Sequence, residues 1–177
     1  NKRIAVNTKP RHSSAWDSPK EAPMAGSWTK SEWQLRPDPR YSDRVLAKFI
    51  NCVMHDGKKS VALRVVYDAL DQMAARLEKE KVEGMPASAI ELFNKAIENT
   101  KPNVEVRSKR VGGANYQVPM QVTAPRRQAL SFRWLLEAAR GEKGKPIADR
   151  LAKELWDAAK GEGKAMTKRD ETHRMAE

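Results

Sequence analysis

The sequence contains few cysteines and histidines, the residues that most often bind metals or act as nucleophiles and bases. It contains one cysteine in 177 residues, which excludes an internal disulfide and a cysteine-rich metal site. Cys52 lies in the apolar run 49–54, and this position predicts a buried structural thiol rather than a nucleophile. The three histidines, His12, His55 and His173, are scattered and lack the spacing of metal ligands or of a catalytic triad. We therefore expect no enzymatic activity, no metal and no cofactor.

Two further absences narrow the class of protein. No apolar run approaches the ~20 residues that a membrane-spanning helix requires, so the sequence predicts no insertion into a membrane. Gly112 and Gly113 are not followed by a helix start or by the lysine of a phosphate-binding P-loop. A nucleotide site is therefore not indicated.

Positive charge is present in excess, and it is unevenly distributed. The formal net charge is +11. Residues 101–140 hold eight Lys/Arg and two Asp/Glu, and residues 1–40 hold eight and four, whereas residues 41–100 hold nine of each. A localised basic excess is typical of a site for a polyanion, with nucleic acid the first candidate and an anionic membrane surface the second.

The basic segment 101–140 also contains the only clear pair of strands. Val104 and Val106 alternate with charged residues, and Tyr116 and Val118 begin a second alternating run after a glycine-rich turn. This pattern predicts a β-hairpin over about residues 103–123, with its turn at 112–115. A ribbon this polar cannot bury both faces, so it should stand out from a helical body or lie against a partner.

Helical periodicity dominates the rest of the chain. The apolar spacing and the cap residues predict helices over about 43–55, 60–77, 87–99, 126–140, 146–160 and 167–177. Trp134 is expected in the core, whereas Trp156 could face the core or a partner. The predicted fold class is mainly α: a six-helix, bundle-like domain at 41–177 with one protruding two-stranded β-hairpin, preceded by an extended basic N-terminal arm at 1–40.

Three tryptophans are unusual in such an arm. Trp16, Trp28 and Trp33 lie in a segment without helical or strand periodicity. They could anchor the arm in grooves of RNA or of neighbouring proteins, or they could pack back onto the domain. Both alternatives stay open.

Several blocks of the sequence match a known family. VEVRSKRVGGANYQVPMQV is followed by RRQALSFRWLLEAAR, with RPDPRYSDRVLAKFINCVMHDGKKSVALRVVYDAL upstream and TKRDETHRMAE downstream. In this order and spacing they closely resemble the small-subunit ribosomal protein seven family of bacterial and organellar type. The resemblance covers roughly residues 36–177 and implies a structural constituent of the small ribosomal subunit.

The resemblance carries further expectations about function. It implies binding to the 3′ major (head) domain of the small-subunit ribosomal RNA, nucleation of head assembly, and a hairpin near the exit tRNA site and the mRNA path. The implied partners are this RNA, exit-site tRNA and mRNA, and neighbouring head and platform proteins, with no membrane. A free helical nucleic-acid-binding regulatory protein is the alternative. Because the chain starts with Asn and its arm is longer than the bacterial pattern, we slightly favour an organelle, the mitochondrion first, over the bacterial cytoplasm.

The candidate contact residues are cations together with the hairpin tip. Lysines offer point charges to phosphates, and arginines bind phosphate with two donors or stack on bases. The candidate RNA-binding residues are Arg36, Lys58, Lys59, Arg107, Lys109, Arg110, Arg126, Arg127, Arg133, Lys168, Arg169 and Arg174. The candidate tip residues near tRNA and mRNA are Gly112, Gly113, Asn115 and Tyr116.

Overall fold

The structure is a computed structural model that describes residues 35–79, 86 and 88–176. These residues lie within one compact unit, Leu35–Glu177. Most of the predicted arm therefore falls outside the described residues, and so does the predicted anchoring of Trp16, Trp28 and Trp33.

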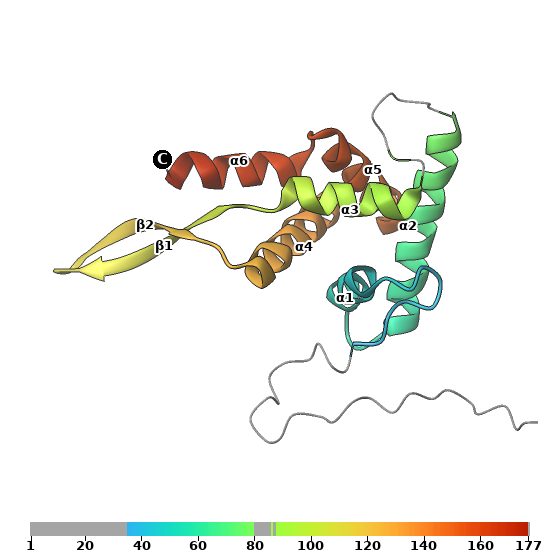
Figure 1. Ribbon diagram of the computed structural model, residues 1–177, viewed down its shortest axis with the longest axis horizontal. Helices are drawn as coiled ribbons and strands as arrows, with labels where there is room; N and C mark the ends of the chain where they lie inside the picture. Colours follow the sequence, from blue (N-terminus) through green and yellow to red (C-terminus); the bar gives the residue numbers. More distant parts are fainter. Residues whose placement is uncertain (1–34, 80–85, 87, 177) are drawn as a thin grey trace, which may run out of the picture. The chain divides into compact units, whose positions relative to one another are not determined.

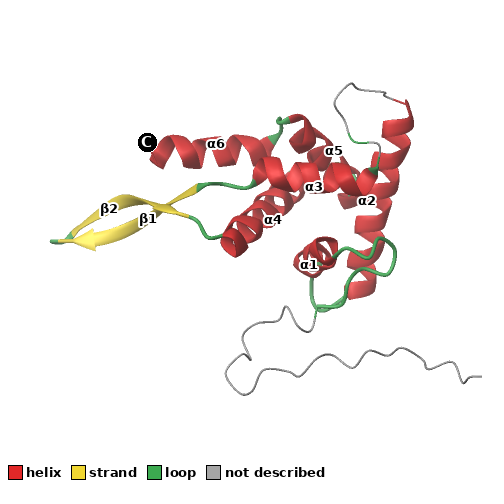
Figure 2. Ribbon diagram, viewed as in Figure 1, coloured by secondary structure: helices red, strands yellow, loops and turns green. Residues whose placement is uncertain are grey.

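Within the described residues the fold consists of six helices and one antiparallel two-stranded sheet (Figures 1 and 2). In chain order the elements are α1 Arg44–Val53, α2 Lys59–Lys79, α3 Ala89–Thr100, β1 Val104–Val111, β2 Ala114–Gln121, α4 Ala124–Gly141, α5 Ile147–Lys160 and α6 Lys164–Ala176. The predicted mainly α class, with one hairpin between the third and fourth helices, is confirmed. No helix in this part of the chain combines the length and the hydropathy needed to cross a bilayer.

Aromatic side chains mark two parts of the core. Phe49 of α1 packs edge-to-face against Phe93 of α3 and Phe132 of α4, with 5.3 Å between ring centroids in both pairs. Trp156 of α5 is fully buried, and the guanidinium carbon of Arg76 on α2 lies 4.6 Å from its ring centroid. One hydrophobic core thus contains side chains from all six described helices, and Trp156 faces this core rather than a partner.

Two assignments of buried residues have different outcomes. Trp134 is buried on α4, as predicted. The prediction of a buried Cys52 is wrong, because this side chain is exposed. The buried residues of α1 are Leu46, Ala47, Phe49 and Ile50. At about 100° per residue, position 52 lies on the opposite side of the helix from this stripe.

α6 begins at Lys164, earlier than the predicted start near residue 167. Its first turn is stabilised by a carboxylate from another helix: Glu154 of α5 accepts a hydrogen bond from the Ala165 N–H at 2.8 Å. Gly163 leaves room for this contact, since a Cβ there would lie 3.0 Å from Glu154 Oε1 and the residue has φ +97°. A cap supplied from a distant part of the chain is not visible in the local sequence pattern.

The hairpin has a two-residue turn rather than the predicted turn over 112–115. Gly112 and Gly113 have φ +59° and +92°, which suits a tight hairpin turn in which both central residues have positive φ. Asn115 therefore belongs to β2. The register pairs Lys109 with Tyr116 and Arg110 with Asn115, and directly opposite residues of an antiparallel pair share a face.

This register leaves the ribbon without a wholly apolar face. Arg107 pairs with Val118 and Glu105 with Met120, so charged residues of β1 lie opposite apolar residues of β2. Every residue of β2 is exposed. The ribbon extends away from the helices (Figure 1), as its polarity predicted.

Candidate nucleic-acid interface

Glu105 organises the base of the hairpin. Arg126, in the first turns of α4, donates to its carboxylate through Nε at 3.1 Å and Nη2 at 2.8 Å. Arg107 Nε lies 3.8 Å from the same group. The hydrogen bond from Arg126 holds the pKa of Glu105 below its usual value, and the positive charges of Arg107 and Arg133 act in the same direction. One carboxylate thus pairs with two arginines, Arg126 and Arg107, at the base of the hairpin.

Arg127 also has a partner within the protein. Its Nε donates to the Val122 carbonyl at 3.1 Å, and the Val122 N–H donates to the Asn103 carbonyl at 3.2 Å. Arg126 and Arg127 therefore join α4 to the base of the hairpin. A guanidinium carries five N–H donors, so each retains donors for a second partner such as a phosphate.

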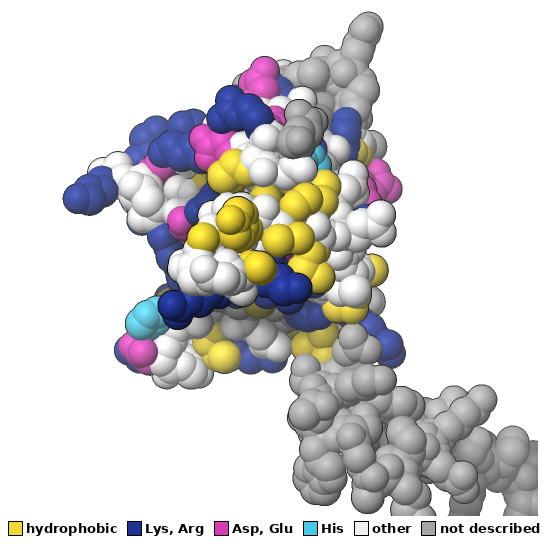
Figure 3. All heavy atoms as spheres, turned by 90° about the vertical axis from the view of Figure 1, so that its left-hand side faces the viewer, with side chains coloured by type: hydrophobic (Ala, Val, Ile, Leu, Met, Phe, Trp, Pro, Cys, Tyr) yellow, Lys and Arg dark blue, Asp and Glu magenta, His cyan; other side chains and the backbone are white. Residues whose placement is uncertain are grey.

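The outer half of the hairpin carries exposed cations beside an exposed aromatic ring. Lys109 and Arg110 are exposed, and so is Tyr116, with 57% of its surface accessible. No acidic residue follows Glu105 in either strand. Figure 3 looks onto the end of the molecule toward which the hairpin points, and Lys and Arg side chains lie around the apolar ones there. Cations beside an exposed aromatic ring can bind phosphates and stack on bases.

The predicted cations of α6 differ in their surroundings. Lys168 pairs with Glu137 of α4 at 2.6 Å. Arg169 pairs with Asp170 and also donates to the Asn99 carbonyl at the end of α3. Arg174 is exposed. Arg169 therefore has a structural contact that the sequence did not indicate, whereas Arg174 has an accessible charge.

Arg36, Lys58 and Lys59 lie elsewhere. All three are exposed: Arg36 lies in the segment before α1, Lys58 in the turn between α1 and α2, and Lys59 at the start of α2. This part of the unit is separated from the hairpin in Figure 1. The structure thus divides the candidate cations into a hairpin group, on the hairpin, α4 and α6, and a corner group near the α1–α2 turn.

His173 is a contact residue that sequence reasoning missed in this role. Its Nε2 accepts a hydrogen bond from the Asn103 N–H at 3.1 Å, immediately before β1. Arg169 lies four residues earlier, and residues at this spacing share a helix face. From the sequence, this spacing could have indicated that His173 and Arg169 act on the same side of the helix. It does not identify the partner of His173, Asn103, which is 70 positions away in the chain.

Asp38 is a second missed residue, and its role is structural. It is buried, and its carboxylate accepts hydrogen bonds from the Tyr67 hydroxyl at 2.6 Å and from the Arg40 and Tyr41 N–H groups at 3.1 Å. Burial of Tyr67 and its hydrogen bond to Asp38 raise the pKa of the Tyr67 hydroxyl to about 12. The described end of the predicted arm is therefore fixed onto α2.

Comparison with known proteins supports one family. The model of the family described as ribosomal protein S7p/S5e matches residues 26–177. The chain is 53% identical over 152 residues to the small ribosomal subunit protein uS7 of Rhodopirellula baltica, which covers 86% of this chain and 93% of that protein. It is 54% identical over 144 residues to the protein of the same name from Chromobacterium violaceum, covering 81% and 87%.

These findings confirm the resemblance that the sequence blocks indicated. The relatives come from bacteria, including Bartonella henselae at 50% identity over 144 residues, so they do not support the predicted preference for a mitochondrion. The match extends over the hairpin and all six described helices. The chain belongs to the ribosomal protein S7p/S5e family.

Proposed function

We propose that the protein is a structural component of the small ribosomal subunit, in a ribosome of bacterial type, and that it binds the ribosomal RNA through its hairpin group of cations. The observation that carries this proposal is the acid-free outer hairpin, with Lys109 and Arg110 exposed beyond an arginine cluster held by Glu105. Such groups neutralise phosphates and release condensed counterions. The proposed role is that of a scaffold and not that of an enzyme.

The inner and the outer cations of the hairpin group have different proposed tasks. Arg126 and Arg127 are fixed by internal partners, so they offer remaining donors at a defined position, which favours two-donor contacts with phosphate. Lys109, Arg110 and Arg174 are exposed, so their charges add sequence-independent attraction for phosphates. Fixed cations near the body would set the orientation of the RNA, and the outer ones would add affinity.

The corner group has a parallel task. Arg36, Lys58 and Lys59 are exposed on a separate part of the unit, so both groups together would contact two RNA segments at once. A rigid helical body between two basic areas is suited to holding RNA helices at a fixed angle. This supports the proposed role in nucleating assembly of the head, on the 3′ major domain of the RNA.

The hairpin tip has the most specific proposed position. By family resemblance, Gly112, Gly113, Asn115 and Tyr116 would lie near exit-site tRNA and the mRNA path. Neighbouring head and platform proteins would complete the surroundings. The accessible ring of Tyr116 and the amide of Asn115 are suited to stacking and to hydrogen bonding with an unpaired base.

Salt dependence of RNA binding tests the proposal. If about five to eight phosphates are contacted, the logarithm of the affinity for head-domain RNA should fall with the logarithm of the salt concentration at a slope of roughly −4 to −7. Removing Lys109 and Arg110 should lower the magnitude of the slope by about two. A slope near zero, or failure of the protein to co-sediment with small subunits at moderate salt, would contradict the proposal.

A further inference from the structure

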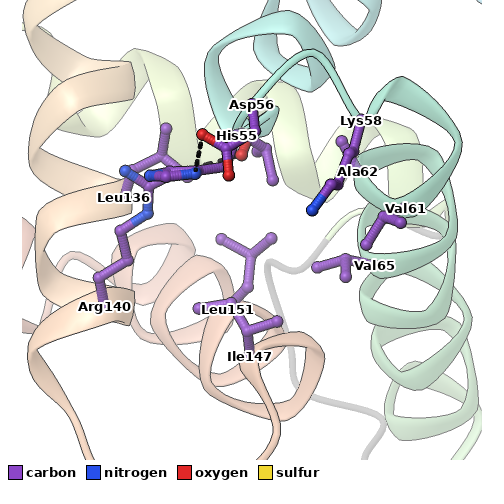
Figure 4. A pocket seen from close by; sticks show the side chains of 11 residues that line it. His55, Asp56, Lys58, Val61, Ala62, Val65, Leu136, Arg140, Ile147 and Leu151 are labelled. Carbon is purple, nitrogen blue, oxygen red and sulfur yellow. Dashed lines mark hydrogen bonds and ion pairs between the residues drawn. The ribbon is translucent and has the colours of Figure 1, made fainter.

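A partly open groove lies away from the hairpin, at the corner between α1 and α2. We call it the corner groove. It has a volume of about 270 Å³, and its floor consists of apolar side chains from α1, α2, α4 and α5: Val53, Val61, Ala62, Val65, Leu136, Ile147 and Leu151. All of these residues except Val53 are labelled in Figure 4, where their side chains lie around a common space. Val61 on α2 remains 53% exposed, so part of the floor is accessible from outside.

The rim of the corner groove is polar and carries excess positive charge. His55, Asp56, Lys58 and Arg140 surround the floor (Figure 4). Asp56 is close to His55, with 3.0 Å between the carboxylate and Nδ1. Arg140 donates to the Val53 carbonyl at 3.2 Å, which holds its guanidinium at the rim without neutralising it. Lys58 and Arg140 therefore present two positive charges against one carboxylate.

We infer that the corner groove is a docking site for a segment of another protein, one that inserts a large apolar side chain and presents a carboxylate beside it. The floor fits the apolar group, because removing accessible valine surface from water is favourable. The rim fits the carboxylate, because the guanidinium of Arg140 can form charge-assisted hydrogen bonds with it, and Lys58 is then left for the RNA contact proposed for the corner group. The inference rests on the proposed function, which makes the donor of this segment a neighbouring protein of the small subunit.

Other occupants fit the groove less well. A phosphate backbone would match the cations of the rim but would leave Val61 and Val65 facing water. Sites for free small molecules commonly have volumes of about 300–1,000 Å³ and enclose most of the ligand, whereas this groove is smaller and open on one side. Its size is that of a pocket for an interface anchor, where one bulky side chain contributes much of the binding energy.

Photo-crosslinking in purified small subunits tests the occupant. The full chain would carry p-benzoylphenylalanine in place of Val61, and the crosslinked partner would be sequenced. We expect a crosslink to one protein, at a peptide with a bulky apolar residue and an Asp or Glu within one helical turn of it. A crosslink to ribosomal RNA, a crosslink to a peptide without these residues, or no crosslink from incorporated chain would overturn the inference.

A pair of matched substitutions completes the test. Val61→Asp should lower the amount of the partner protein, as identified by the crosslink, in assembled subunits by about tenfold when that partner is supplied at limiting concentration. A tenfold loss is the effect expected when one anchor contact is removed. Val111→Asp is the control, since Val111 is also 53% exposed but lies on the hairpin, and it should leave that amount unchanged. An equal effect of both substitutions would overturn the inference. If the unsubstituted chain itself fails to enter small subunits, the proposed function is wrong and the inference falls with it.

Discussion

At the scale of single residues, the carboxylates determine how the cations are arranged. Glu105 pairs with Arg126 and Arg107 at the base of the hairpin, Glu137 pairs with Lys168, and Glu154 caps α6. From the sequence alone, Arg126 and Arg127 are identified only as candidate RNA-binding residues. Their internal partners, Glu105 and the Val122 carbonyl, depend on how α4 meets the hairpin, which no local pattern encodes.

Glu105→Gln should weaken the hairpin base in a pH-dependent way. Because the pKa of Glu105 is lowered in the folded protein, its stabilising contribution is present above the unfolded-state pKa of about 4.3 and is lost as the pH falls through the folded-state value. At pH 7 the substitution should lower the free energy of unfolding by ~0.5–1 kcal/mol, and the difference should shrink toward zero in acid. Urea unfolding across this pH range measures it.

The control for Glu105 is Glu137→Gln, which removes an exposed ion pair. It should change stability less, because water screens both of its partners. Equal effects of the two substitutions at every pH would contradict the organising role of Glu105.

Glu154 should show the opposite pH dependence. Burial raises its pKa in the folded protein, so the contribution of this group to stability is fully present at low pH and is lost as the pH rises from about 4.3 through the raised folded-state value. The wild type should therefore lose stability relative to Glu154→Gln between pH 4 and pH 7. Glu154→Ala should cost ~1–2 kcal/mol, because the Ala165 N–H loses its acceptor. A pH-independent difference between wild type and Glu154→Gln would refute this assignment.

At the scale of elements, helix and strand types follow from local periodicity, whereas the start of α6 depends on a contact from another helix. The alternation after Val104 and the stripe of α4 identify a hairpin followed by a helix, because both signals repeat within a few residues. It is harder to predict from the sequence which face of a short helix is buried. The apolar run that contains Cys52 is longer than the buried stripe of α1, and only packing decides which of its members face inward.

Beyond its first turn, α6 is held by polar contacts with α4, with the end of α3 and with the segment before β1. Its buried side chains, Ala165 and Met166, are confined to the first turn, whereas Arg169 and His173 contact Asn99 and Asn103. His173→Ala should therefore speed hydrogen exchange of the Asn103 amide by about two- to tenfold, the range for a net hydrogen bond of ~0.5–1.5 kcal/mol. Arg174→Ala is the control and should leave this amide unchanged. Unchanged exchange in His173→Ala would show that the contact is not populated in solution.

At the scale of the whole unit, we expect the helical body to determine stability and the hairpin tip to act at the exit site. The core includes no residue between 104 and 121, so replacing residues 109–116 with a two-residue turn should change the free energy of unfolding by less than ~0.5 kcal/mol. Incorporation into small subunits should persist through the corner group and α4. Occupancy of the exit site by deacylated tRNA should fall, because the tip is missing.

Both quantities can be measured on the same particles. Lys109→Ser with Arg110→Ser is the matched variant, which keeps the length of the hairpin and removes its outer charge. Poor incorporation of the trimmed chain, with normal tRNA occupancy in the particles that form, would show that the hairpin anchors the protein and does not act at the exit site.

The tight turn at Gly112 and Gly113 gives the ribbon two unequal sides. One side carries Lys109 with Tyr116, and the other carries Arg110 with Asn115. Side chains alternate between the two faces of a strand. One extra residue at the turn would therefore move every side chain of one strand to the opposite face of the hairpin. The hairpin is thus directional: a binding partner meets a cation beside an aromatic ring from one side, and a cation beside an amide from the other.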